Sequence, residues 1–224
     1  MNCQMCQNYI DNELSLLQTL GLLKNQKKLI CQACESDFAV ITMSCSGCGR
    51  QQKSTQLCRD CRRWQQQGKI LLKHTALYQY NDAMRSFMQQ YKFNGDYKLR
   101  GIFNSKFIQI IKSLSKDVIV PIPVSENTMK TRGFNQTTGL LEGIIYQELL
   151  QVTTIKKSHQ SQFNRKARML RQQPFTLKES SISLRGKHVL LVDDIYTTGN
   201  TLYHAADLLY SAGAINVKSI SLAR

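Results

Sequence analysis

The eight cysteines of this chain form four Cys-x-x-Cys pairs, and all of them lie within the first 61 residues. Two residues between cysteines turn the backbone so that both sulfurs can reach one ion about 2.3 Å away, and two such pairs complete a tetrahedral site. Glycines at 47 and 49 flank Cys48 and permit the tight turn that this geometry favours. The pattern predicts two structural zinc ions, with these ligands: Cys3, Cys6, Cys31, Cys34, Cys45, Cys48, Cys58 and Cys61.

Other uses of the cysteine pairs fit less well. A thioredoxin-like redox pair needs a βαβ setting, which surrounds none of the four, and an iron–sulfur cluster is a further alternative. The spacing leaves open whether the first pair joins the second or the pairs interleave. A zinc ion held by four thiolates has no open position, so we assign no catalytic role to these sites.

The rest of the sequence indicates a folded protein of the cytoplasm. The chain has 224 residues, of which 42% are apolar. It contains no run of about 18 apolar residues, and its start lacks the basic-then-apolar order of a secretory signal, so we expect no membrane insertion. Zinc ligation by thiolates also suits a reducing compartment. We expect a metal-binding domain over residues 1–70 and a second domain over residues 71–224.

The second domain carries most of the positive charge. The formal net charge of the chain is +15, and the zinc-bound thiolates offset part of the charge near the start. Residues 76–224 have 20 Lys and Arg against 10 Asp and Glu. The partners expected there are anions, such as phosphates or nucleic acid.

Apolar patterning predicts alternating strands and helices in this domain. We expect a strand at residues 77–80, a helix that begins after Asn81, and a second helix with a buried face over residues 99–114. The apolar run at 118–123 predicts a strand covered on both faces of a parallel sheet. A polar loop with Lys130, Arg132 and Gly133 should follow, and then a helix over residues 134–149. This order of elements indicates an α/β fold.

The segment 188–201 has the strongest chemical pattern. Four apolar residues predict a buried strand, and Asp193 and Asp194 stand at its carboxyl end, where open α/β sheets bind ligands. The loop that follows leads into a helix, and free N–H groups at such a helix start favour an anion. Its hydroxyls and glycine suit a phosphate: Thr197, Thr198, Gly199, Asn200 and Thr201. Two carboxylates would repel a phosphate but suit the hydroxyls of a ribose, so ribose 5-phosphate satisfies both halves.

This segment resembles the phosphoribosyl pyrophosphate (PRPP) signature of type I phosphoribosyltransferases. The resemblance implies that Asp193 and Asp194 hold the ribose hydroxyls and that Thr197 to Thr201 cradle the 5′-phosphate. It also implies a pyrophosphate loop from Pro123 to Arg132, with Lys130 and Arg132 on the pyrophosphate, and Mg²⁺ bound together with PRPP.

The whole chain is similar to the ComF family. The features in order are the four cysteine pairs, Lys-Phe-Asn-Gly-Asp at 92–96, Val-Pro-Ile-Pro at 120–123, Arg-Gly-Phe-Asn-Gln at 132–136 and the PRPP signature. The family resemblance implies a double zinc ribbon fused to a type I phosphoribosyltransferase-like parallel sheet flanked by helices. It further implies a competence role in DNA uptake during natural transformation, beside a helicase-like ATPase.

A basic segment precedes the PRPP-like signature. It contains Lys156, Lys157, Arg165 and Arg168, and no acidic residue lies between positions 156 and 171. Type I enzymes close a mobile basic loop over pyrophosphate, and this segment is the candidate. A track for single-stranded DNA and a solvated basic face are the alternatives.

Two functional hypotheses follow. In the first, which we favour, the chain is a competence factor that retains PRPP binding. In the second, it is an active phosphoribosyltransferase of nucleotide metabolism whose acceptor the sequence does not identify. Catalysis would additionally need an acceptor site and usually a proton acceptor, and we assign no residue to catalysis.

Overall fold

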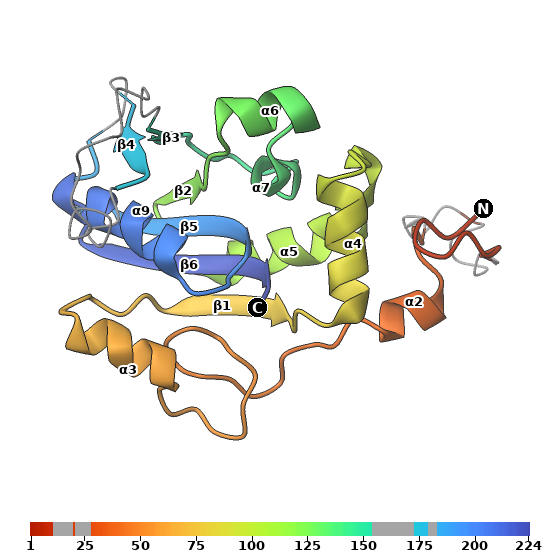
Figure 1. Ribbon diagram of the computed structural model, residues 1–224, viewed down its shortest axis with the longest axis horizontal. Coiled ribbons are helices and arrows are strands. Elements are labelled where there is room, and N and C mark those ends of the chain that lie inside the picture. Colours follow the sequence, from red (N-terminus) through yellow and green to blue (C-terminus); the bar gives the residue numbers. More distant parts are fainter. Residues whose placement is uncertain (11–19, 21–27, 154–172, 179–182) are drawn as a thin grey trace, which may run out of the picture.

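The computed structural model describes residues 1–10, 20, 28–153, 173–178 and 183–224, and every structural statement below refers to these residues. Helices and strands follow one another in the order shown in Figure 1. The first part of the chain contributes the short helices α2 (Gln32–Ser36) and α3 (Arg59–Gln66) around the cysteines. No helix in these ranges is long and apolar enough to cross a membrane.

A four-stranded parallel sheet forms the centre of the molecule. Its strands are β1 (His74–Tyr78), β2 (Val118–Pro121), β5 (His188–Ile195) and β6 (Asn216–Ala223), in the spatial order β1-β6-β5-β2. Successive β5 residues point to opposite faces, so Val189 and Leu191 belong to one apolar cluster whereas Leu190 and Val192 belong to the other. Both faces of the sheet are therefore covered, and the predicted α/β fold class is confirmed.

Helices α4 (Asp82–Lys92) and α5 (Gly101–Ser113) pack on the face that includes Leu190. The Asn81 side chain caps α4 by accepting a hydrogen bond from the Met84 amide at 3.1 Å, as the sequence predicts. A 3₁₀ turn, η1 (Tyr97–Arg100), joins the two helices. The residues that α4 buries recur at helical spacing: Met84, Phe87, Met88 and Tyr91. Burying each of these side chains contributes about 1.5–3 kcal/mol, which fixes α4 against the sheet.

The segment after β2 differs from the prediction. The expected polar loop forms helix α6 (Glu126–Arg132), because Ser125 caps its start and Gly133, with a φ of 82°, ends it. The expected helix over 134–149 is wrong: α7 (Gln136–Gly139) is a single turn, and Ile145 is 89% exposed. Gly143, with a φ of 88°, lies in the turn that follows, where a helix cannot continue.

A small antiparallel hairpin lies beside the main sheet. Strands β3 (Leu150–Val152) and β4 (Phe175–Leu177) pair with each other and flank the basic segment. The basic residues predicted to close over pyrophosphate or to bind DNA lie outside the described residues. Helix α9 (Asn200–Ser211) packs between β4 and the main sheet, where β5 leads into its start.

Two groups of four cysteines confirm the zinc-ribbon pattern and resolve its pairing. Cys3, Cys6, Cys31 and Cys34 form one group, and Cys45, Cys48, Cys58 and Cys61 form the other, so the pairs combine sequentially. Residues of the second group share an apolar cluster with β5 and α9. The second ribbon therefore packs against the sheet, and the expected domain boundary at residue 70 stays a prediction.

Candidate functional site

The two carboxylates at the end of β5 are both buried. Asp193 is 8% exposed and Asp194 is 4% exposed. The Asp194 amide donates to Asp193 Oδ1 at 2.9 Å. Gln136 Nε2 donates to Asp194 Oδ1 at 3.2 Å, and the Lys92 ammonium forms an ion pair with the other Asp194 oxygen. The structure thus brings together two predicted acids with a lysine and an amide that come from α4 and α7.

The two acids differ in their electrostatic surroundings. Burial raises the pKa of the Asp193 carboxyl well above its ordinary value, and the neighbouring Asp194 carboxylate raises the pKa further, although Lys92 opposes the shift. Asp194 has the direct lysine contact. The Asp193 carboxyl, whose pKa is raised, and the Asp194 carboxylate beside Lys92 both present oxygens that can hydrogen-bond to the hydroxyls of a sugar.

The loop after β5 has unpaired amides. The N–H groups of Thr197, Thr198, Gly199 and Thr201 donate to no acceptor among the described residues. Thr197, Thr198 and Thr201 are exposed, and α9 begins at Asn200. Several free amides at the start of a twelve-residue helix make a site that attracts an anion.

Glycine is required at position 199. Its φ is 89°, and a Cβ built there would lie 2.3 Å from the hydroxyl oxygen of Tyr196. Any larger residue would strain the backbone and push Tyr196 aside. The loop conformation that leaves the amides free therefore depends on Gly199.

Two side chains, Trp64 and Arg224, donate hydrogen bonds to carbonyls of the same loop. Trp64 Nε1 donates to the Thr198 carbonyl at 3.3 Å, and its ring stacks on Tyr203 with centroids 4.3 Å apart. Arg224, whose side chain is 3% exposed, donates to the Thr197 carbonyl at 2.9 Å and lies 4.1 Å above the Tyr196 ring. With these carbonyls bound on the inner side of the loop, the amides point to no acceptor among the residues that the structure describes. Trp64 belongs to α3 of the second zinc ribbon, so the ribbon supports the anion loop.

The two predicted pyrophosphate residues lie on α6 in different settings. Arg132 donates to Gln136 Oε1, and Gln136 in turn contacts Asp194, which links Arg132 to the carboxylates. Lys130 is exposed and forms no hydrogen bond or ion pair with a described residue. Arg132 is therefore joined to the acids, whereas Lys130 stays available to an incoming anion.

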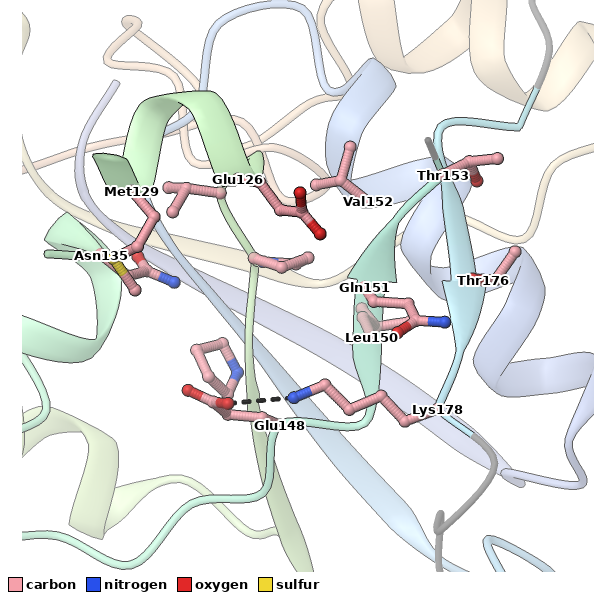
Figure 2. Close-up of a pocket in the computed structure, with 13 residues that line it drawn as sticks. Glu126, Met129, Asn135, Glu148, Leu150, Gln151, Val152, Thr153, Thr176 and Lys178 are labelled. Carbon is pink, nitrogen blue, oxygen red and sulfur yellow. Dashed lines mark hydrogen bonds and ion pairs between the residues drawn. The ribbon is translucent and has the colours of Figure 1, made fainter. Parts of the chain in front are cut away.

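Two cavities lie at the carboxyl ends of β2 and β5, one lined in part by Pro121 and the other in part by Ile195. The first, of about 350 Å³, lies between the segment after β2 and the β3–β4 hairpin. Figure 2 shows Glu126 and Asn135 on the side of the segment after β2, and the ion pair between Glu148 and Lys178, 3.0 Å long, at the bottom of the view. The other, of about 380 Å³, is lined by residues that include Lys92, Phe93 and Ile195. Either has the size of a small-ligand pocket.

The cysteine groups fit tetrahedral zinc. Within each group the four sulfurs lie within 4.8 Å of one another; the Cys6 and Cys31 sulfurs are 3.7 Å apart, and the Cys48 and Cys58 sulfurs are 3.4 Å apart. A Zn–S bond of 2.3 Å requires sulfurs about 3.8 Å apart, whereas a disulfide requires about 2 Å. The Cys58 amide also donates to Cys45 Sγ at 3.2 Å, as is favourable for a thiolate. A metal here would hold the ribbon together.

Four side chains of the site were not among the predicted ligands: Lys92, Gln136, Trp64 and Arg224. Lys92 and Gln136 belong to the motifs at 92–96 and 132–136, which mark them as candidates but not as partners of Asp194. Trp64 and Arg224 carry no such signal, because their role depends on packing between distant segments.

Comparison with known proteins agrees with this architecture. Residues 104–224 match the phosphoribosyl transferase domain family. A competence protein ComFC of Streptococcus pneumoniae is 37% identical over 227 residues, which cover 100% of both chains. A competence protein ComFC of Bacillus subtilis is 33% identical over 230 residues, which cover 99% of this chain and 94% of the relative.

A solved structure of the allosteric regulatory enzyme of purine biosynthesis is a remote neighbour, with 19% identity and a TM-score of 0.38. The match covers 60% of this chain and 30% of the enzyme, a likeness too distant to bear on function. The full-length relatives carry the assignment: this chain belongs to the ComFC family of competence proteins and contains a phosphoribosyl transferase domain.

Proposed function

We propose that this protein acts in DNA uptake during natural transformation and that its phosphoribosyl transferase domain binds PRPP or ribose 5-phosphate. One observation carries the proposal: two buried carboxylates at the end of β5 are followed at once by a loop with free amides. Asp193 and Asp194 hold the ribose hydroxyls, and the amides and hydroxyls from Thr197 to Thr201 hold the 5′-phosphate.

The remaining cations complete the proposed ligand site. Lys130 and Arg132 bind the pyrophosphate, and Mg²⁺ enters with PRPP, whose phosphate oxygens suit that ion. The basic segment with Lys156, Lys157, Arg165 and Arg168 closes over the site or guides DNA. The basic segment lies in the sequence between β3 and β4, and residues of both strands line the cavity of Figure 2, which supports closure of this segment over the site.

The proposed setting is the cytoplasm, where thiols stay reduced and available to zinc. There the protein works beside a helicase-like ATPase on single-stranded DNA. Family membership and the positive net charge of +15 support this role.

Titration calorimetry with Mg²⁺-PRPP tests the ligand. We expect one binding event per chain, and a loss of affinity of more than about tenfold in the double variant Asp193→Asn/Asp194→Asn. The matched control is Asp82→Asn/Asp207→Asn, which removes two carboxylates outside the proposed site. Asp82 is exposed, and Asp207 lies toward the far end of α9. Absence of heat with the unaltered protein, or an equal loss in both double variants, would contradict the proposal.

Catalytic transfer of the phosphoribosyl group is the second candidate function. The two cavities at the ends of β2 and β5 favour it, because each could hold an acceptor. Release of pyrophosphate from PRPP on addition of nucleobases or amines would establish turnover. PRPP affinity with no pyrophosphate release from any acceptor would leave the binding role alone.

A further inference from the structure

Helix α3 of the second zinc ribbon has two contrasting faces. Cys61 and Trp64 are buried on the inner face, where Cys61 joins the metal group and Trp64 holds the Thr198 carbonyl. The outer face consists of residues spaced at i, i+3, i+4 and i+7, which is one side of a helix. Together with Asp60, these residues line a hollow on the surface: Arg59, Arg62, Arg63 and Gln66.

The arginines of this outer face, called here the arginine face, have no acidic partners. Asp60 is the carboxylate of α3, and it is already bound by Arg50 at 2.5 Å and lies 3.9 Å from Arg224. Within the described part of the chain, no carboxylate lies within 4.0 Å of the charged groups of Arg59, Arg62 or Arg63. Like charges three and four residues apart cost an isolated helix about 0.2–0.5 kcal/mol per pair. The hollow thus presents three arginines beside one carboxylate, Asp60, which is already paired with Arg50, so its charge is predominantly positive.

We propose that the arginine face binds the phosphate backbone of single-stranded nucleic acid. The guanidinium group presents a planar fork of donors that matches phosphate oxygens in pairs. Arg59 and Gln66 are seven positions apart, which corresponds to about 10 Å along the helix, so the face spans a short stretch of backbone. The described residues that line the hollow include no aromatic side chain, so we expect this face to contact the backbone without stacking on or reading bases.

The arginine face is separate from the PRPP site. The side chains of the arginine face are exposed, whereas Trp64, which contacts the anion loop, is buried, and the Arg63 guanidinium carbon lies 5.9 Å from the centroid of the Trp64 ring. Figure 1 shows α3 at the edge of the molecule, beyond β1. A strand on this face therefore leaves the amides of Thr197 to Thr201 free. The inference rests on the DNA role in the proposed function and names the surface that carries it.

Fluorescence anisotropy with a labelled oligodeoxythymidylate of about 20 nucleotides tests this surface. The titration is repeated between about 50 and 200 mM salt with three proteins: the unaltered full chain, the variant Arg59→Gln/Arg62→Gln/Arg63→Gln, and a control. The control, Lys112→Gln/Arg185→Gln/Lys187→Gln, removes the same charge from exposed positions elsewhere.

We expect the arginine variant to lose at least about tenfold in affinity, with a log–log salt slope that is smaller in magnitude by up to about 2, because each lost phosphate contact contributes about 0.7. The control should keep its affinity within about threefold. Affinity for Mg²⁺-PRPP should stay unchanged in both variants, since none of the replaced residues contacts the carboxylates or the loop directly, and Trp64, over which Arg63 lies, keeps its hydrogen bond to the Thr198 carbonyl.

The outcomes separate the two proposals. If the unaltered protein fails to bind the oligonucleotide, the DNA role falls, and this inference falls with it. If the unaltered protein binds but the two triple variants lose affinity equally, the arginine face is the wrong surface while the DNA role stands. If polyglutamate displaces the oligonucleotide as effectively as unlabelled DNA of equal charge, the face binds an acidic protein instead, which overturns the inference.

Discussion

The Lys92 ammonium forms an ion pair with the Asp194 carboxylate and joins the last turn of α4 to the end of β5. The Lys92 side chain is 15% exposed and that of Asp194 is 6% exposed, so the pair is largely shielded from water. A charge pair in this position neutralises a carboxylate that would otherwise repel a phosphate, and it connects the folding of α4 to the geometry of the proposed ribose site.

Replacing Lys92 by methionine should destabilise the protein. The substitution leaves Asp194 buried without its partner, and breaking one side of a buried ion pair costs about 3–5 kcal/mol. Urea unfolding measures the loss. The double variant Lys92→Met/Asp194→Asn should recover most of that stability, because no unpaired charge remains. A double variant as unstable as Lys92→Met would show that lost packing, and not the charge, is responsible.

Replacing Asp193 by asparagine should stabilise the protein at neutral pH and raise its Tm by at least about 2 °C. The pKa of the Asp193 carboxyl is raised in the folded state, so folding favours its protonated form and the free energy of unfolding falls as pH rises above the ordinary carboxyl pKa through the raised value. The asparagine variant lacks this fall, and it still accepts the Asp194 amide.

Unfolding in urea across the acidic and neutral range checks the sign of this effect. The stability advantage of Asp193→Asn should be absent at low pH, where both states are protonated, and should grow as pH rises. Asp82→Asn, at an exposed carboxylate, serves as the control and should show no such growth. An advantage that does not change with pH would exclude the proposed cause.

Replacing Trp64 by phenylalanine should weaken PRPP binding with little change in stability. Phenylalanine can still stack on Tyr203 but cannot donate to the Thr198 carbonyl, so the loop loses one of its restraints. One hydrogen bond is worth about 0.5–1.5 kcal/mol, which corresponds to about a two- to tenfold loss of affinity. Tyr210→Phe removes a hydrogen bond at the other end of α9 and should leave affinity unchanged. Equal affinities in all three proteins would contradict the loop's dependence on Trp64.

Loss of the second metal site should impair the anion loop, whereas loss of the first should not. Elemental analysis should give two zinc ions per chain, and one in each of the variants Cys61→Ser and Cys6→Ser. Cys61 is fully buried beside Trp64 on α3, whereas Cys6 is exposed. We expect PRPP affinity to fall by more than about tenfold in Cys61→Ser and to remain within about threefold in Cys6→Ser. Equal losses in the two variants would mean that the first ribbon also supports the loop.

Local sequence signals predicted the metal groups and the β5 segment well. Two-residue spacing fixes each cysteine pair, and a short buried strand followed by Gly199 specifies a turn into α9 with few alternatives. Asn81 likewise predicted the start of α4, because a cap acts within three residues of itself. These features depend on neighbours in the sequence, so they can be read without the fold.

Features that depend on distant contacts were not predictable. Lys92 and Asp194 are 102 residues apart in the sequence, and only packing of α4 against the sheet brings them together. The apolar positions between 140 and 149 suggested a helix, but Leu150 pairs with Leu177 in the hairpin and the tertiary contact overrides the local pattern. The contact of Arg224 with the loop was not predictable for the same reason, because packing of β6 beside β5 brings Arg224 to the Thr197 carbonyl.

The placement of β6 between β1 and β5 has a consequence during protein synthesis. Ribosomes extend the nascent chain from its amino end, so the cysteine ligands emerge long before residues 216–223 can enter the gap between the flanking strands. Until then the neighbours of that gap have exposed edges, which are open to wrong pairing with other chains. Zinc binding by the cysteine groups soon after their synthesis would keep that part of the chain folded until β6 has been synthesised.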